Sequence, residues 1–128
     1  MKYYFEKTIN GDFEKITNKV RKALESYGFG VIAEIDMDKN FKEKLGVDFR
    51  PYKILGVCNP EISYEVLQAE DKIGTLLPCN VIIQELEPNK IEVAAVDPAA
   101  SLMAIKNYKL ESAAGKVRGI LEEMIEEL

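Results

Sequence analysis

The chain has 128 residues, of which 47% are hydrophobic, enough for one buried core, so we expect a single domain over residues 1–128. Its 17 basic and 22 acidic side chains give a net charge of −5, which argues against binding to nucleic acids or anionic membranes. The sequence contains no histidine, which excludes Ser-His-Asp and Cys-His catalysis and histidine-ligated zinc within one chain.

The N-terminal segment and the cysteine content indicate the cellular compartment. Residues 1–10 contain no apolar core of a signal peptide, and no apolar run approaches the roughly 20 residues that a membrane span needs. Two cysteines do not make a disulfide framework in a chain of this length, so we expect reduced thiols. Together these features predict a soluble cytoplasmic protein.

The first quarter of the chain predicts a strand, a helix and a second strand. Tyr3, Phe5 and Ile9 share one face of the first strand, which ends at residues 10–11. Asp12 is placed to cap a helix. The apolar positions of this helix recur at spacings of three and four: Phe13, Ile16, Val20, Leu24 and Tyr27. Gly28 can end it, and a second strand is predicted over residues 29–36.

The middle of the chain predicts two short helices around a third strand. Asp36 or Asp38 can cap a helix over residues 37–45, and Gly46 can end it. A strand over residues 52–57 follows. Asn59 and Pro60 then supply an N-cap and a first-turn proline for another helix, whose apolar positions are Ile62, Val66 and Leu67.

A β-hairpin is predicted next. Residues 81–86 and 91–96 are apolar and can pair across residues 87–90. The simplest antiparallel register sets Leu86 opposite Ile91.

Both strands of this hairpin carry apolar residues on both faces. In the expected register, one face holds Ile82, Leu86, Ile91, Val93 and Ala95, and the other holds Val81, Ile83, Ala94 and Val96. A sheet with one solvated face would alternate apolar and polar residues, so the second face should also be covered. Either a second subunit or the short helices after Asp36 and Asn59 could cover it, and the pattern alone does not distinguish these alternatives.

The C-terminal part predicts a short helix over residues 99–103 and a long one from Leu110 to the end. Gly115 and Gly119 interrupt the long helix, so we expect another element to approach its backbone closely there. The order of elements predicts an α+β fold with a largely antiparallel sheet.

Three sequence blocks resemble a known family. The segments KEKLGVDFRPYKILGVCNP, LQAEDKIGTLLPCNVII and VAAVDPAASL are similar to the signature blocks of the domain of unknown function 302 family. The resemblance implies a βαβ₄α order, in a TBP-like arrangement with a long C-terminal helix, and a dimeric protein. It implies no mechanism.

Polar residues gather where the predicted strands end. Cys58 ends one strand and Cys79 begins the next, so antiparallel neighbours would bring both thiols to one edge of the sheet. Asn59 lies at the same edge, and the expected register of the hairpin sets Asn80 opposite Asp97 there. These residues are candidates for a pocket rim. The structural alternative makes the cysteines core residues, and Asn59 and Asp97 helix caps.

Arg50 is the remaining candidate, because it stands in an apolar stretch. Its guanidinium could bind the carboxylate or phosphate of a ligand, or pair internally with Asp48 or Asp97. Two thiols without histidine are too few for a structural zinc site, so we expect no metal and no cofactor.

Three functional classes fit these residues, of which the last is a purely structural interaction module. The first is a homodimer that binds a small ligand or acts as a regulatory or accessory protein, with Asn59, Asn80, Asp97 and Arg50 as polar contacts. The second is a thiol-dependent enzyme or redox sensor that uses Cys58 and Cys79, although neither a base nor a CxxC spacing is present to activate a thiol. No nucleic-acid or membrane partner is expected.

Overall fold

The structure, a computed structural model, describes residues 2–102 and 105–128. Its elements are β1 (Tyr4–Asn10), α1 (Phe13–Ser26), β2 (Gly30–Asp36), α2 (Met37–Leu45), β3 (Tyr52–Cys58), α3 (Pro60–Ala69), the 3-10 helix η1 (Asp71–Leu76), β4 (Cys79–Glu87), β5 (Lys90–Val96), α4 (Pro98–Ser101) and α5 (Tyr108–Glu127). The α+β class, the βαβ₄α order and the long C-terminal helix are confirmed. Residue 103, with which the short helix was predicted to end, lies outside the described residues. None of the helices described is both long and apolar enough to cross a membrane.

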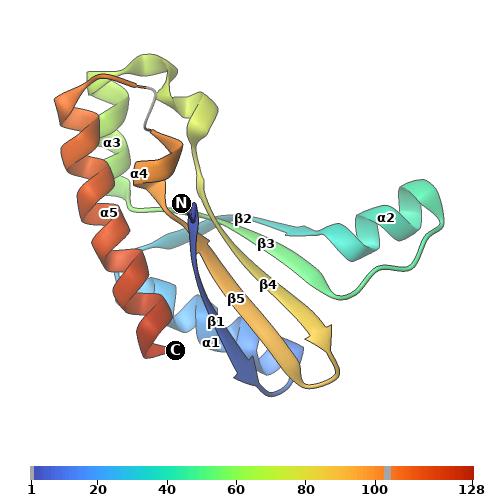
Figure 1. The fold of residues 1–128 in the computed structure, drawn as a ribbon. Coiled ribbons are helices and arrows are strands. Elements are labelled where there is room, and N and C mark those ends of the chain that lie inside the picture. The colour runs from blue at the N-terminus through green and yellow to red at the C-terminus, as the bar shows by residue number, and fades with distance from the viewer. Residues whose placement is uncertain (1, 103–104) are drawn as a thin grey trace.

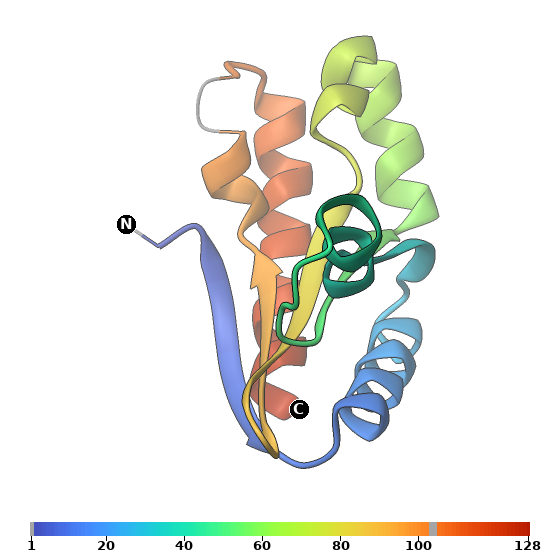
Figure 2. The ribbon, with the colours of Figure 1, turned by 90° about the vertical axis from the view of Figure 1, so that its right-hand side faces the viewer.

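The five strands form one antiparallel sheet in the order β1-β5-β4-β3-β2. Helices α1 and α5 cover one face, where they enclose the main core (Figure 1). Fully buried residues of this core come from both helices and from the sheet, and include Leu24 of α1, Leu55 and Ile83 of the sheet, and Leu121 and Met124 of α5. On the opposite face, which is turned toward the viewer in Figure 2, α2 projects outward from the ends of β2 and β3.

Two of the predicted N-caps form, but the predicted cap of α2 by Asp36 or Asp38 is wrong: Asp36 makes no side-chain cap hydrogen bond, and Asp38 accepts from the backbone N–H of Tyr52 instead. The carboxylate of Asp12 accepts a hydrogen bond from the backbone N–H of Lys15 at 3.0 Å, and the side chain of Asn59 accepts one from the N–H of Ile62 at 3.1 Å. Each cap satisfies an N–H that the first turn of its helix leaves without an intrahelical partner. Gly46 ends α2 in the left-handed conformation, with φ of 69°.

The register of the β4–β5 hairpin differs from the prediction by one residue. Glu85 pairs with Ile91 and Glu87 pairs with Lys90, so Leu86 is an extra residue in a β-bulge. The predicted Leu86–Ile91 pair is therefore wrong. Because side chains alternate along a strand, the shift exchanges the two faces of β4 relative to β5.

After this exchange, the core face of the hairpin contains Val81, Ile83, Ile91, Val93 and Ala95, all fully or almost fully buried. Ile82 lies on the other face with Ala94 and Val96. We call this other face the open face and define it by Tyr4, Glu6, Tyr52, Ile82, Gln84, Glu92, Ala94 and Val96. It is still rich in apolar residues. Helix α2 buries none of its residues and α3 packs against α5, so these short helices do not provide its cover.

The expected close approach to α5 at its two glycines is wrong. A Cβ atom at Gly115 or Gly119 would meet no heavy atom within 4 Å, and both residues are exposed. These glycines face solvent, so packing against another element does not offset their cost to helix stability.

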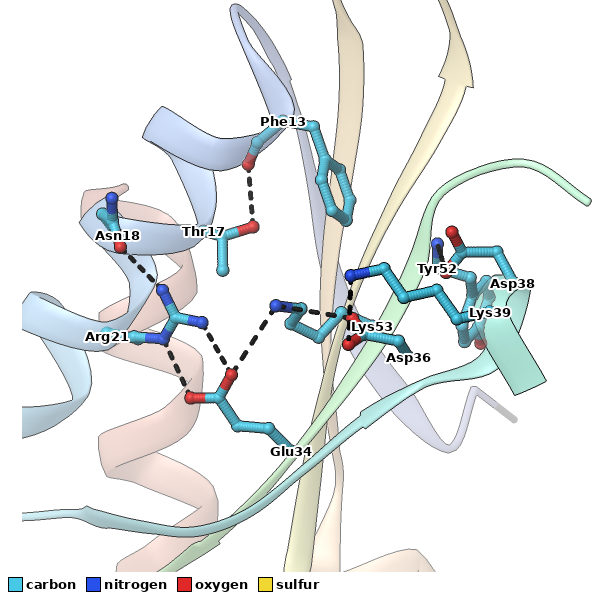
Figure 3. A network of polar contacts seen from close by, with 10 residues as sticks. All are labelled: Phe13, Thr17, Asn18, Arg21, Glu34, Asp36, Asp38, Lys39, Tyr52 and Lys53. Carbon is cyan, nitrogen blue, oxygen red and sulfur yellow. Dashed lines mark hydrogen bonds and ion pairs between the residues drawn. The ribbon is translucent and has the colours of Figure 1, made fainter. Parts of the chain in front are cut away.

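An ion-pair network fixes the edge strand β2 to the rest of the protein (Figure 3). Arg21 of α1 donates two hydrogen bonds to the carboxylate of Glu34, from Nε at 3.0 Å and from Nη2 at 2.6 Å. The Nζ atom of the buried Lys53 lies 3.6 Å from Glu34 and 3.4 Å from Asp36. The hydrogen bond from Arg21 lowers the pKa of Glu34. The network therefore joins α1, β2 and β3 at the base of the projecting α2.

Replacing Glu34 by Gln is expected to lower the free energy of unfolding at pH 7 by about 0.5 kcal/mol, because the Arg21–Glu34 pair is partly exposed and screened by solvent. Since folding lowers the pKa of Glu34, the pair stabilises the protein above the unfolded-state pKa of about 4.3 and loses its effect as the pH falls below it. Urea unfolding at pH 7 and near pH 3 measures both effects. If the difference in the free energy of unfolding between wild type and variant were as large near pH 3 as at pH 7, this account would be contradicted. The exposed change Glu25→Gln serves as control.

Candidate functional site

A cavity of about 360 Å³ lies where β3 ends and β4 begins. Helices α3, α4 and α5 and the 3-10 helix η1 surround this end of the sheet. Most of its walls are apolar: Phe29, Val57, Ile62, Val66, Leu67, Ile73, Leu76, Leu77, Pro78, Leu102, Ala113, Ala114 and Val117. The volume is within the range of small-molecule sites, which is roughly 300–1,000 Å³.

Four of the six residues that the sequence singles out line this cavity: Cys58, Asn59, Cys79 and Asn80. The pairing of β3 with β4 brings them together, because Val57 lies opposite Cys79 and Gly56 opposite Asn80. This register places the Cα atoms of the two cysteines within about 9 Å of each other. Asn80 faces Gly56 of β3, and the predicted pairing of Asn80 with Asp97 is wrong because of the bulge at Leu86.

Asp97 lies beside the cavity, and its side chain makes two hydrogen bonds within the protein. Its carboxylate accepts a hydrogen bond from the backbone N–H of Ala99 at 3.0 Å, which caps α4, and another from Nε of Arg118 at 3.1 Å. Its side chain is buried. Asp97 therefore connects the end of β5 to α4 and α5, around the wall of the cavity.

Arg50 lies elsewhere, in the loop after α2, where it contacts the open face. Its Nε donates to Oε1 of Gln84 at 2.7 Å, and its guanidinium stacks 4.3 Å from the ring centre of Phe49. The predicted internal partners have other contacts, since Asp48 pairs with Lys42 and Asp97 with Arg118. The structure thus separates Arg50 from the other five candidates.

The two thiols have different surroundings. The Sγ atom of Cys58 lies 2.7 Å from the hydroxyl oxygen of Ser63, one turn into α3. Burial raises the pKa of the Cys79 thiol, and the neighbouring Cys58 raises it further. Cys79 therefore stays protonated at neutral pH, which makes it a poor nucleophile. Both cysteines are free.

The cavity offers few polar contacts. None of the described residues that line it carries a charge. The side-chain oxygen of Asn59 already caps α3, and the hydroxyl of Ser63 already contacts Cys58. In the described part of the chain, no three His, Cys, Asp or Glu side chains are placed to hold a metal ion.

Sequence reasoning missed the mouth of the cavity. Ile32, Leu67 and Leu76 line it and are exposed to solvent. Ile32 sits where the pairing of β2 with β3 skips a residue, and such bulges redirect a side chain without a clear sequence signal. Leu76 belongs to η1, which the sequence analysis did not predict. One sequence feature could have indicated η1: Glu70 precedes it, and its side chain caps η1 by accepting a hydrogen bond from the backbone N–H of Lys72.

Comparison with known proteins agrees with this architecture. The family model described as "Domain of unknown function DUF302" matches residues 5–128. The crystal structure of an uncharacterized conserved DUF302 protein from Bacillus stearothermophilus is similar, with a TM-score of 0.89, 22% sequence identity and coverage of 98% of each chain. At this identity the likeness shows the fold alone. The comparison with curated proteins gave no match. Because the family model covers nearly the whole sequence, the chain belongs to the DUF302 family.

Proposed function

We propose that this protein binds a small, uncharged and largely apolar molecule in the cavity between α3, η1, α5 and the end of the sheet. The observation that carries the proposal is an apolar cavity of about 360 Å³ with an apolar mouth and no charged lining residue among those described. Apolar walls with a few polar groups are typical of small-molecule sites. Asn80 and Ser101 are the remaining polar lining residues that could orient a ligand, and Asn80 also borders the open face.

The chemistry of the walls argues against an anionic ligand. A phosphate or carboxylate inside the cavity would need a cation or a helix N-terminus with free N–H groups. Two helix starts border the cavity: at α3, Pro60 has no N–H and Asn59 already bonds the N–H of Ile62, and at α4, Pro98 has no N–H and Asp97 already bonds the N–H of Ala99. A charged group buried there would therefore lose hydration without gaining a partner.

Binding can be tested with two fluorescent probes of similar shape, neutral N-phenyl-1-naphthylamine and the anionic 8-anilinonaphthalene-1-sulfonate. We expect the neutral probe to bind at least ten times more tightly, a difference of about 1.4 kcal/mol. The variant Ala114→Phe, which adds a ring to the cavity wall, should weaken binding of the neutral probe at least tenfold. Ser112→Phe places the same ring on the exposed side of α5 and should leave binding unchanged.

A thermal melt of each variant shows whether it is folded, and Ala114→Leu replaces Ala114→Phe if the larger ring prevents folding. Equal affinity of both probes, or binding that Ala114→Phe does not change, would reject the cavity as the site. The thiol alternative has its own signature, which is alkylation of Cys58 faster than that of free cysteine. The raised pKa of Cys79 argues against such reactivity at that residue. The cytoplasmic location expected from the sequence stays a prediction.

A further inference from the structure

A second hollow adjoins the cavity at one end of the sheet. It is a depression of about 450 Å³ on the open face, over β1, β5, β4 and the start of β3. Asn80 and Val96 line both the cavity and this depression. They are neighbours on adjacent strands, since the next pair along the ladder is Val81 with Ala95. The cavity and the depression therefore meet at Asn80 and Val96, and we call this place the junction.

The two hollows differ in chemistry. The walls of the cavity are largely apolar, and none of its described lining residues carries a charge. The depression has an apolar floor, which includes Ile82, Ala94 and Val96, but tyrosine, amide and carboxylate side chains also line it. The surroundings thus change from apolar to polar across the junction. A molecule that occupies both hollows must have an apolar and a polar part.

The charged groups at the depression already have partners within the protein. The carboxylate of Glu6 lies 3.3 Å from Nζ of Lys2. Gln84 donates from Nε2 to the carboxylate of Glu92 at 2.8 Å, and its Oε1 accepts from Nε of Arg50 at 2.7 Å. A charged group of a ligand would have to replace one of these partners. The depression therefore favours a polar group without charge.

Neutral donors and acceptors remain around the floor of the depression. The hydroxyls of Tyr4 and Tyr52 and the amide of Asn80 form no hydrogen bond with any residue that the structure describes. Tyr4 pairs with Val96 beside the junction, and Tyr52 pairs with Gln84 on the far side of the floor. Hydroxyl and amide side chains both donate and accept hydrogen bonds. They match a ligand group that carries several hydroxyls.

We propose that the ligand of this protein is an amphiphile, with an unbranched alkyl chain in the cavity and a neutral, hydroxyl-bearing head in the depression. This inference rests on the proposed function and extends it, because the cavity takes the apolar part of the molecule. A chain of eight carbons needs about 240 Å³, at roughly 30 Å³ per methylene, which is also the space of a water molecule, and the cavity has about 360 Å³. The chain leaves water, while the head keeps hydrogen-bond partners and covers apolar residues of the open face.

Alkyl glucosides below their micellar concentrations test this proposal. Their affinity is measured by displacement of N-phenyl-1-naphthylamine from the full-length protein. We expect octyl β-D-glucoside to bind at least ten times more tightly than hexyl β-D-glucoside, since burial of each methylene contributes about a fourfold factor. 1-Octanol has the same chain without the sugar and reports on the cavity alone.

Variants of the depression separate the head from the chain. Ile82→Trp fills the floor and should weaken binding of octyl glucoside at least tenfold. The double variant Tyr4→Phe/Tyr52→Phe removes two hydroxyls and should weaken it at least threefold. Both should leave the affinities for 1-octanol and the naphthylamine probe within a factor of two. The matched controls Ile35→Trp and Tyr64→Phe, at exposed positions that line neither hollow, should change no affinity.

The outcomes distinguish this inference from the proposed function. Circular dichroism checks that each variant is folded, and the tyrosine double variant carries the test if Ile82→Trp is not. If the naphthylamine probe binds in the cavity but octyl glucoside does not displace it, this inference is overturned and the proposed function stands. The same holds if the depression variants leave the affinity for octyl glucoside unchanged. A wild-type protein that does not bind the naphthylamine probe would overturn both.

Discussion

Replacing Asp97 by Ala is expected to lower the free energy of unfolding by about 2 kcal/mol. The loss has two sources, since the carboxylate caps α4 through Ala99 and pairs with Arg118. Loss of an N-cap costs about 1 kcal/mol. The ion pair contributes about as much again, because the side chain of Asp97 is only 6% exposed, whereas that of Arg118 is 43% exposed and can be rehydrated. Urea unfolding at pH 7 measures the difference.

The variant Asp97→Asn separates the two sources. Its amide oxygen can still accept the hydrogen bond from Ala99 but cannot form the ion pair, so about half of the loss should remain. Affinity for the neutral naphthylamine probe should stay within a factor of two in both variants, because Asp97 does not line the cavity. Unchanged stability together with tenfold weaker binding would show instead that Asp97 contacts the ligand.

The fold was predictable from the sequence where interactions between residues close in the chain determine the structure. The 3.6-residue spacing of Ile16, Val20 and Leu24 fixes the buried side of α1, and the caps at Asp12 and Asn59 fix where two helices begin. These signals act within one or two turns of chain. They needed no knowledge of distant parts of the molecule, and the structure confirms them.

The register of the hairpin was not predictable in this way. Leu86 is apolar and continues the strand pattern, so nothing in the sequence marks it as the extra residue of a bulge. A single unpaired residue was enough to exchange the faces of β4 and to separate Asn80 from Asp97. The partner of Arg50 was missed for a related reason, because Gln84 comes near it only through the pairing of β3 with β4.

The candidate site was predictable in part. Two Cys-Asn pairs at facing strand ends meet because consecutive antiparallel strands share an edge. The remaining walls come largely from α3, η1 and α5, and those of α5 include the small residues Ala113 and Ala114. Small side chains on the buried side of a helix leave space beside it. Whether that space stays open as a cavity depends on how α5 packs against α3, which the sequence does not show.

Replacing Gly56 by Val is expected to lower the free energy of unfolding by at least about 2 kcal/mol. A Cβ atom at Gly56 would lie 2.8 Å from Cγ of Pro78 and 3.3 Å from Cβ of Ala33. Neither neighbour is the end of a flexible side chain, so the backbone of β3 or the segment before β4 must move, and such overpacking costs about 1–3 kcal/mol. Strand propensity alone predicts that Gly56→Val stabilises the protein, because Val is favoured over Gly in strands by up to about 1 kcal/mol.

The matched control is Gly115→Ala on α5, where the added Cβ meets nothing within 4 Å. We expect it to stabilise the protein by about 0.5–1 kcal/mol, since Ala is the better helix former and no contact opposes it. Urea unfolding of both variants compares a glycine that packing requires with one that it does not. A stabilised Gly56→Val variant would mean that Pro78 does not pack against β3. Because Pro78 also lines the cavity, that result would remove one wall of the candidate binding site as well.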